Sequence, residues 1–387
     1  MRFPEFNGEW ETKSINDLAD VIGGGTPDTT VKSYWDGEIQ WFTPSEIGKN
    51  KFVDASLRTI TEDGLNNSSA KLLPPNTILL SSRATIGECS LSLRECATNQ
   101  GFQSLVSKKC NVDYLYYLIQ TKKKDLIRKS CGSTFLEISA NEVRKIQVSV
   151  PSDVEQQKIA ELLSLIDERI VTQNKIIEDL KKLKSAISKH LFTRKDLLET
   201  TICLSEIATL RNGYAFQSSK YNALGKWKIL TITNVSGERH INDEDCNCII
   251  NLPDDIQDHQ VLKEGDILIS LTGNVGRVSL CKDGDYLLNQ RVGLLQLAKN
   301  VNQEFLYQIL SSQKFENSMI ACGQGAAQMN IGKGDVESYV LPYSSNGNNI
   351  LWIAKILHSY DECIINEQRR LTLLTMQKQY LLTQMFI

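Results

Sequence analysis

The chain has 387 residues, of which 23% are charged, and a formal net charge of −3. This length allows two or three domains that each bury a core, and the charge neither favours nor excludes a nucleic-acid partner. No run of about 18 apolar residues is present, and MRFPEFNGEWETK at the start lacks the apolar stretch of a secretory signal. We therefore expect a cytoplasmic protein without a membrane partner.

The first part of the chain, up to about residue 150, reads as a mixed α/β domain. Short β-rich runs such as NTILLSS lie between turns rich in Gly, Pro, Asn and Asp, and the helix VDYLYYLIQTKKKDLIRK follows at 112–129. The strands cluster without regular β-α-β alternation. This arrangement argues against a doubly wound nucleotide-binding sheet.

Polar loops and one basic helix supply candidate DNA contacts in this domain. In the loop SSRATIGE the guanidinium of Arg83 could bond bidentately to guanine, with Thr85 beside it, and the amides of Asn99 and Gln100 suit adenine edges. A buried amide that supports a loop is the alternative for the Asn-Gln pair. A cationic run could neutralise phosphates or form a solvated helix face, and it comprises Lys122, Lys123, Lys124, Arg128 and Lys129. Two hydroxyl residues, Ser133 and Thr134, are further candidates.

A long helix follows, with EQQKIAELLSLIDERI at 155–170 as its first turns. Apolar residues keep a 4-3 spacing from Ile159 to Leu191, broken only at Gln173 and Lys184. A seam of this length is typical of a coiled coil.

The same order of segments returns after residue 194. CLSEIATLRNGYAF at 203–216 matches SINDLADVIGGGTP at 14–27, and KEGDILISLTGNVGRVSL at 263–280 matches PPNTILLSSRATIGECSL at 74–91. A gene duplication with small loop insertions explains the series of matches. The candidate contacts of the second half are Thr272, Asn274, Arg277, Asn289, Gln290, Arg291, Gln324 and Gln328.

A second seam helix, beginning with ILWIAKILHSYDECI at 350–364, runs on to Met385 and is broken at Glu367 and Lys378. Such seams bury themselves best against each other, so we expect an antiparallel pair; the alternative is two helices that each pack on their own domain. One register would place Lys184 opposite Glu367 and Gln173 opposite Lys378, polar against polar. The predicted fold is α+β, a pseudo-two-fold repeat with globular domains at 1–151 and 194–343 and coiled-coil helices at 152–193 and 344–387.

Motifs of catalysis are missing from the sequence. The only Pro-Pro lies in LPPN at 73–76, IGKGD at 331–335 departs from a P-loop, and no CxxC occurs. The four histidines lie far apart in sequence. We therefore expect no catalytic residue, no metal site and no cofactor in this chain.

RFPEFNGEWETKSINDLADV, VPSDVEQQKIAELLSLIDERI with its Lys-rich continuation, and the two-half layout together resemble the specificity subunit of Type I restriction-modification enzymes. The resemblance implies two target-recognition domains that each read half of a split double-stranded DNA target. It also implies two modification subunits that methylate adenine and restriction (translocase) subunits that cleave, with S-adenosylmethionine, ATP and Mg belonging to those partners. The second helix departs from the pattern, because SSNGNNILWIAKIL lacks the Glu155-Gln156-Gln157 of the first. From the residues alone, a coiled-coil adaptor without DNA specificity is the alternative function.

Overall fold

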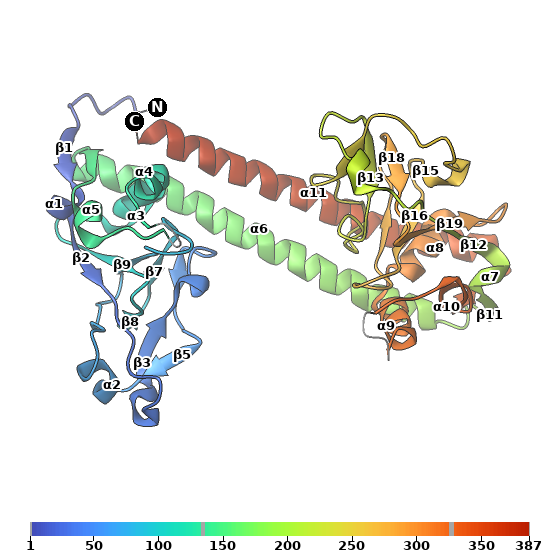
Figure 1. Ribbon diagram of the computed structural model, residues 1–387, viewed down its shortest axis with the longest axis horizontal. Coiled ribbons are helices and arrows are strands. Elements are labelled where there is room, and N and C mark those ends of the chain that lie inside the picture. The colour runs from blue at the N-terminus through green and yellow to red at the C-terminus, as the bar shows by residue number, and fades with distance from the viewer. Residues whose placement is uncertain (1, 133–135, 325–328, 387) are drawn as a thin grey trace. The chain divides into compact units, whose positions relative to one another are not determined.

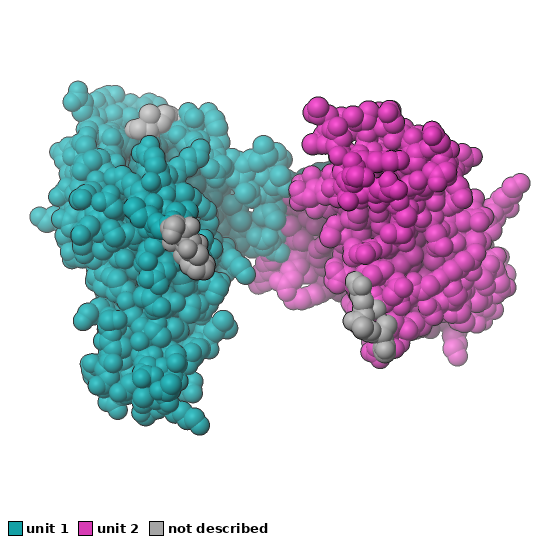
Figure 2. All heavy atoms as spheres, in the orientation of Figure 1, with its two compact units in different colours: residues 1–174, 369–387 teal, residues 175–368 magenta. Residues whose placement is uncertain are grey.

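The computed structural model describes residues 2–132, 136–324 and 329–386. The chain forms two compact units: unit 1 consists of residues 1–174 and 369–387, and unit 2 of residues 175–368 (Figure 2). Each long helix thus contributes one part to each unit. Within the described ranges no helix combines the length and apolarity needed to cross a bilayer.

Unit 1 builds its globular part from two sheets and a strand pair (Figure 1). The five-stranded sheet has the order β2 (Ala19–Gly23), β9 (Gln103–Ser107), β6 (Ile78–Leu80), β7 (Cys89–Ser92) and β4 (Phe52–Val53); the three-stranded sheet has the order β5 (Arg58–Ile60), β3 (Trp35–Phe42) and β8 (Cys96–Thr98). Strand β1 (Glu11–Ser14) pairs antiparallel with β10 (Gln147–Val150). The short helices are α1 (Ile15–Leu18), α2 (Glu62–Asn66), α3 (Val112–Thr121), α4 (Lys123–Arg128) and α5 (Ala140–Arg144), with 3-10 turns η1 (Lys32–Tyr34) and η2 (Pro44–Glu46).

Unit 2 repeats this plan. One sheet has the order β12 (Ala208–Asn212), β19 (Val292–Leu297), β16 (Ile267–Ser270) and β17 (Val278–Leu280); the other has β14 (Asn247–Ile249), β13 (Trp227–Leu230), β18 (Tyr286–Leu288) and β15 (Val261–Leu262). Strand β11 (Thr200–Cys203) pairs with β20 (Val340–Tyr343). The helices are α7 (Leu204–Ile207), α8 (Gln303–Leu310), α9 (Gln313–Cys322) and α10 (Lys333–Glu337), with η3 (Ser218–Lys220) and η4 (Asp258–Gln260). Even the parallel pairing of β3 with β8 returns between β13 and β18, so the predicted internal repeat is confirmed.

The long helices α6 (Asp153–Thr193) and α11 (Gly347–Met385) run antiparallel, as predicted. In unit 1 the start of α6 shares a core with the end of α11, where Ile159 and Leu163 join Leu381 and Met385. In unit 2 the end of α6 meets the start of α11, because Leu191 shares a core with Ile353 and Leu357. The seam residues therefore pack as the 4-3 spacing requires.

The predicted register of the pair is wrong. Lys184 forms its ion pair with Asp361, six residues before the predicted Glu367, at 2.6 Å. Lys378 pairs with Asp167, six residues before the predicted Gln173, at 2.7 Å. Each seam lysine reaches a carboxylate that flanks the opposite seam, so Lys184 and Lys378 are both paired without a polar seam residue as their partner.

In unit 2 Asp361 is the centre of a buried polar cluster, which we call node 2. Its carboxylate, 8% exposed, binds Lys184 of α6 and accepts from Arg239 at 2.9 Å and from Gln308 of α8 at 2.6 Å. Arg239 also pairs with Glu304 at 2.6 Å, and its guanidinium lies over the ring of Tyr307. Node 2 therefore ties both long helices to the globular part of unit 2.

Unit 1 contains an equivalent cluster, node 1, around Asp167. This carboxylate pairs with Lys378 and accepts from the hydroxyl of Tyr117 at 2.6 Å. Burial, followed by the charge of Asp167, raises the pKa of Tyr117 well above its usual range, so the phenol stays a donor. Lys51 pairs with Asp113 at 2.6 Å and lies over the Tyr117 ring, as Arg239 does with Glu304 and Tyr307 in node 2.

Asp361→Ala would leave the largely buried side chains of Lys184 and Arg239 without their shared carboxylate. Because removal of one partner from a buried ion pair is costly, we expect a loss of about 3 kcal/mol in the free energy of unfolding. Urea denaturation followed by circular dichroism measures it. Glu178→Ala, which breaks the exposed pair with Lys182, is the control and should lose less than about 1 kcal/mol. Equal losses in the two variants would contradict a structural role for node 2.

Candidate nucleic-acid interface

In unit 1 the predicted polar loops meet at the end of β6. The loop after β6 is closed by the Ser81 amide, which donates to the Glu88 carbonyl at 2.9 Å. The Ser82 amide donates to Gly101 at 2.8 Å, and the Ile138 amide donates to Ser82 at 3.1 Å. We call residues 81–88, 99–101 and 136–138 loop cluster 1. Two candidates, Ser133 and Thr134, lie outside the described residues.

The same backbone bonds build loop cluster 2, residues 270–277, 289–291 and 329–331. The Ser270 amide donates to Arg277 at 2.9 Å, Leu271 to Arg291 at 3.0 Å, and Ile331 to Leu271 at 2.9 Å. Gln324 is exposed just after α9, and Gln328 lies outside the described residues. Loop cluster 1 contains four of the nine described candidates of the first half, and loop cluster 2 contains six of the seven of the second half.

Arg83 and Thr272 occupy equivalent positions in the two clusters, and each contacts the segment before the next short helix. Arg83, 40% exposed, forms an ion pair with Glu137 at 2.9 Å. The Thr272 hydroxyl donates to Asn330 at 3.0 Å. Beyond them Thr85 and Asn274 are exposed. The clusters therefore share a backbone and differ in the groups that they present.

The asparagines of both clusters support their own turns. The Asn99 side-chain oxygen accepts from the Gly101 amide at 2.8 Å, and that of Asn289 accepts from the Arg291 amide at 3.2 Å. This is the loop-supporting role considered for the amides, and their reading of adenine stays a prediction. Gln100, Gln290 and Arg291 are exposed beside them.

The predicted basic run forms α4 and its flanks. Buried Leu126 anchors the helix, so its charged residues are directed outward. Lys123 pairs with Glu88, and Arg128 pairs with Asp125 at 2.8 Å. The other three cations form no ion pair with any described residue; they are Lys122, Lys124 and Lys129. These three are the better phosphate candidates.

A charge-inverted pair joins each hairpin loop to a helix. Gly87 and Gly276 have φ of +87° and +78°, and a Cβ atom on either would lie 3.3 Å from the Cα of Lys123 or Glu316. Lys123 forms an ion pair with Glu88, and Glu316 forms an ion pair with Arg277 at 3.4 Å. Arg277 therefore corresponds to Glu88 rather than to Arg83. Sequence reasoning missed this pair because the charges are exchanged between the halves.

The remaining reactive groups do not gather into a site. Among the described residues, no three His, Cys, Asp or Glu side chains are arranged to hold a metal ion. All ten cysteines carry free thiols, and burial raises the pKa of Cys89 and of Cys110 to about 12. These two buried thiols stay protonated, which makes them poor nucleophiles.

Comparison with known proteins gives one consistent result. A family model described as the Type I restriction modification DNA specificity domain matches residues 7–182 and again 199–376. The MjaIX specificity subunit of Methanocaldococcus jannaschii is 39% identical over 48% of this chain and 44% of its own length, and the EcoR124I/EcoR124II specificity subunit of Escherichia coli is 31% identical over 49% and 48%. The matched part thus spans about half the length of these two curated relatives.

The solved structures agree on the fold. The S subunit from M. genitalium has a TM-score of 0.59 at 17% identity and covers 100% of this chain and 99% of its own. A chain solved for the assembly and conformational transition of the type I R-M system has a TM-score of 0.61 at 15% identity, covering 99% and 98%. Because the family model matches the chain twice and together the two matches cover most of the chain, this chain belongs to the Type I restriction-modification specificity (S) subunit family.

Proposed function

We propose that the chain is the DNA specificity subunit of a Type I restriction-modification complex and that it recognises a bipartite target, one half-site with each loop cluster. The observation that carries this proposal is the pair of clusters, which share their backbone hydrogen bonds but differ at equivalent positions. Arg83 stands where the other half has Thr272, and Glu88 where it has Arg277. One scaffold with two sets of side chains suits two different half-sites.

The chemistry of each group gives it a role. Arg83 presents a guanidinium that can move from Glu137 to the acceptors of guanine. Lys122, Lys124 and Lys129, which form no ion pair with any described residue, neutralise phosphates. Thr85, Asn274, Gln290 and Arg291 are exposed for base edges or phosphates. Arg277 acts differently in this proposal, because its pair with Glu316 holds the loop against α9.

The chain itself is non-catalytic in this proposal. Two modification subunits methylate adenine, restriction (translocase) subunits cleave, and S-adenosylmethionine, ATP and Mg bind to those partners in the cytoplasm. The family description names DNA specificity and the relatives are named specificity subunits, which supports DNA reading over an adaptor without DNA specificity.

Methylome sequencing of cells with and without this chain tests the function. We expect a split adenine-methylated motif that depends on the chain. The purified chain should also lose affinity for duplex DNA steeply with salt, because phosphate neutralisation releases counterions. An unchanged methylome together with no DNA affinity at low salt would favour the adaptor.

Arg277→Glu should abolish recognition of the second half-site, because two carboxylates would then repel each other between the loop and α9. Adding Glu316→Lys recreates the polarity of the Lys123–Glu88 pair and should restore cognate affinity to within about threefold, or about 0.7 kcal/mol. Titration of cognate and non-cognate duplexes measures both effects. If Arg277 instead contacts DNA directly, the double variant stays inactive, which would contradict the positioning role.

Exchanging residues 1–150 for the equivalent domain of another family member should change one half-site of the methylated motif and preserve the other. The reason is that each loop cluster is assembled entirely within its own unit. Sequencing of methylated DNA from cells that carry the hybrid gives the result. A folded hybrid with both half-sites altered would argue against independent reading.

A further inference from the structure

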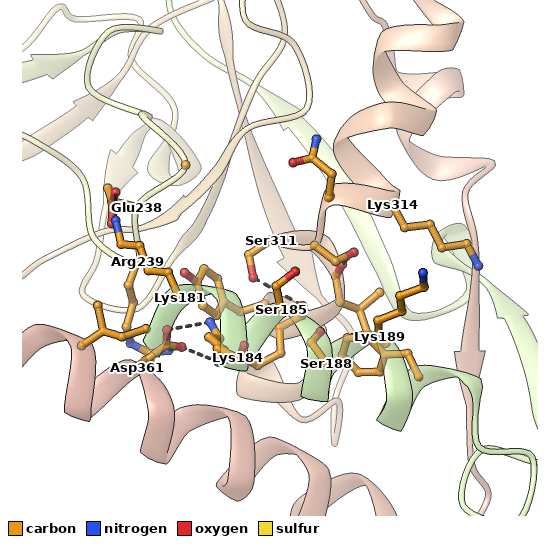
Figure 3. A pocket seen from close by; sticks show the side chains of 18 of the residues that line it. Lys181, Lys184, Ser185, Ser188, Lys189, Glu238, Arg239, Ser311, Lys314 and Asp361 are labelled. Atoms are coloured by element: carbon orange, nitrogen blue, oxygen red, sulfur yellow. Dashed lines mark hydrogen bonds and ion pairs between the residues drawn. The ribbon is translucent and has the colours of Figure 1, made fainter. Parts of the chain in front are cut away.

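A pocket of about 1130 Å³ in unit 2 lies apart from loop cluster 2 (Figure 3). Its walls come from six stretches of the chain, within 181–193, at 237–241, at 282, and within 307–317, 339–342 and 361–368. None of the described lining residues belongs to loop cluster 2. The pocket therefore has no direct part in the proposed DNA reading, whose selectivity depends on the side chains that the loop clusters expose.

The two loop clusters expose one glutamine each at matched positions. Gln100 follows Asn99 in loop cluster 1, and Gln290 follows Asn289 in loop cluster 2. Both glutamine side chains are exposed. A free glutamine amide carries an acceptor oxygen and an amino group with two donors, which together suit the N6 and N7 atoms of adenine. Without a further difference, the two glutamines would read the same base.

In unit 1 the amide oxygen of Gln100 is already engaged by the protein. The Thr26 hydroxyl donates to Oε1 of Gln100 at 2.5 Å. Among the described residues the Nε2 amino group of Gln100 has no hydrogen-bond partner. The protein therefore uses the acceptor of this amide and leaves its two N–H donors available.

The backbone on either side of Thr26 is held in place. The Gly25 carbonyl accepts from the indole Nε1 of buried Trp41 at 2.9 Å. A Cβ atom on Gly24 would lie 2.0 Å from the carbonyl oxygen of Asn99, so glycine is needed for the segment to approach this closely. The position of Thr26 is therefore fixed by its neighbours and not by its hydroxyl bond alone.

Unit 2 makes the same close approach without the hydroxyl group. A Cβ atom on Gly213 would lie 2.2 Å from the carbonyl oxygen of Asn289. The residue matched to Thr26 in the repeat is Ala215, which is exposed. Within the described ranges the side-chain amide of Gln290 has no hydrogen-bond partner. Both its oxygen and its amino group are therefore available.

We propose that Thr26 is a positioning residue that sets which base Gln100 reads. With its oxygen held, Gln100 offers donors alone and selects guanine, whose N7 and O6 both accept, whereas Gln290 keeps both groups and selects adenine. Adenine and cytosine each present an amino group, which finds no acceptor on Gln100, and thymine offers only O4 beside its methyl group. The inference rests on the proposed function, in which each loop cluster reads one half-site, and adds the chemistry of one base in each.

The test uses the full chain with the modification subunit encoded beside it, and the methylated motif is read by sequencing the DNA of cells that carry both. We expect guanine at one position of the first half-site, and Gln100→Ala should locate that position by making it degenerate. Thr26→Ala gives unit 1 the residue of unit 2 and should admit adenine there. Titration of duplexes that differ only at this base pair should show the preference for guanine over adenine falling about tenfold.

Three further variants separate base choice from folding. Thr26→Ser keeps the hydroxyl group and should retain the parent's preference. Thr29→Ala removes an exposed hydroxyl further along the same loop and should also leave the preference unchanged. The reciprocal Ala215→Thr supplies the missing hydroxyl at an exposed position and should shift the base that Gln290 reads from adenine to guanine. A merely structural effect would instead lower affinity for all sequences alike.

The same base preference in Thr26→Ala as in the parent would overturn the inference and leave DNA reading intact. Cytosine at the position that Gln100 reads would overturn it too, because the amide oxygen would then face the DNA. A Gln100→Ala variant with the parent's motif would have the same meaning. If Thr26→Ala does not fold, an unchanged motif in Ala215→Thr would overturn the inference by itself. A parent chain that directs no split methylated motif would instead contradict the proposed function.

Discussion

A largely buried carboxylate on each long helix joins the two long helices to the globular part within each unit. Asp361 and Asp167 each receive a lysine from the opposite helix and a donor from the globular domain. Because an unpaired buried charge is costly, a slide of either helix by one heptad would separate both ion pairs at once. The coiled-coil register and the attachment of each domain are therefore fixed by the same few side chains.

The sequence predicts the long helices, their antiparallel direction and the repeat, since these follow from heptad spacing and from matches such as CLSEIATLRNGYAF with SINDLADVIGGGTP. Its failure on register has a physical cause. Facing polar seam residues seemed the best solution, yet lysine is long enough to leave the seam and reach a neighbouring aspartate. Asp167 and Asp361 lie beside the seam, where a strict a/d pattern gives them no weight.

For the candidate interface, the sequence predicted the loops but not the partners of their side chains. Turn chemistry and the repeat located the loops, and the structure brings them together through backbone bonds. The ion-pair partners of these side chains could not be predicted, because Arg83 meets Glu137 and Arg277 meets Glu316 only after distant segments fold. The pocket of unit 2 was missed for the same reason, since its walls come from six separate stretches of the chain.

The exchanged polarity of the loop-to-helix pairs has a consequence for how such genes can recombine. A crossover between residues 88 and 123 that joined the hairpin of one half to the following helix of the other would combine Glu88 with Glu316, or Arg277 with Lys123. Like charges would then meet where the helix packs on a glycine without spare room. Loop and helix should therefore be inherited together, which makes residues 81–128 a minimal unit of exchange when new specificities arise.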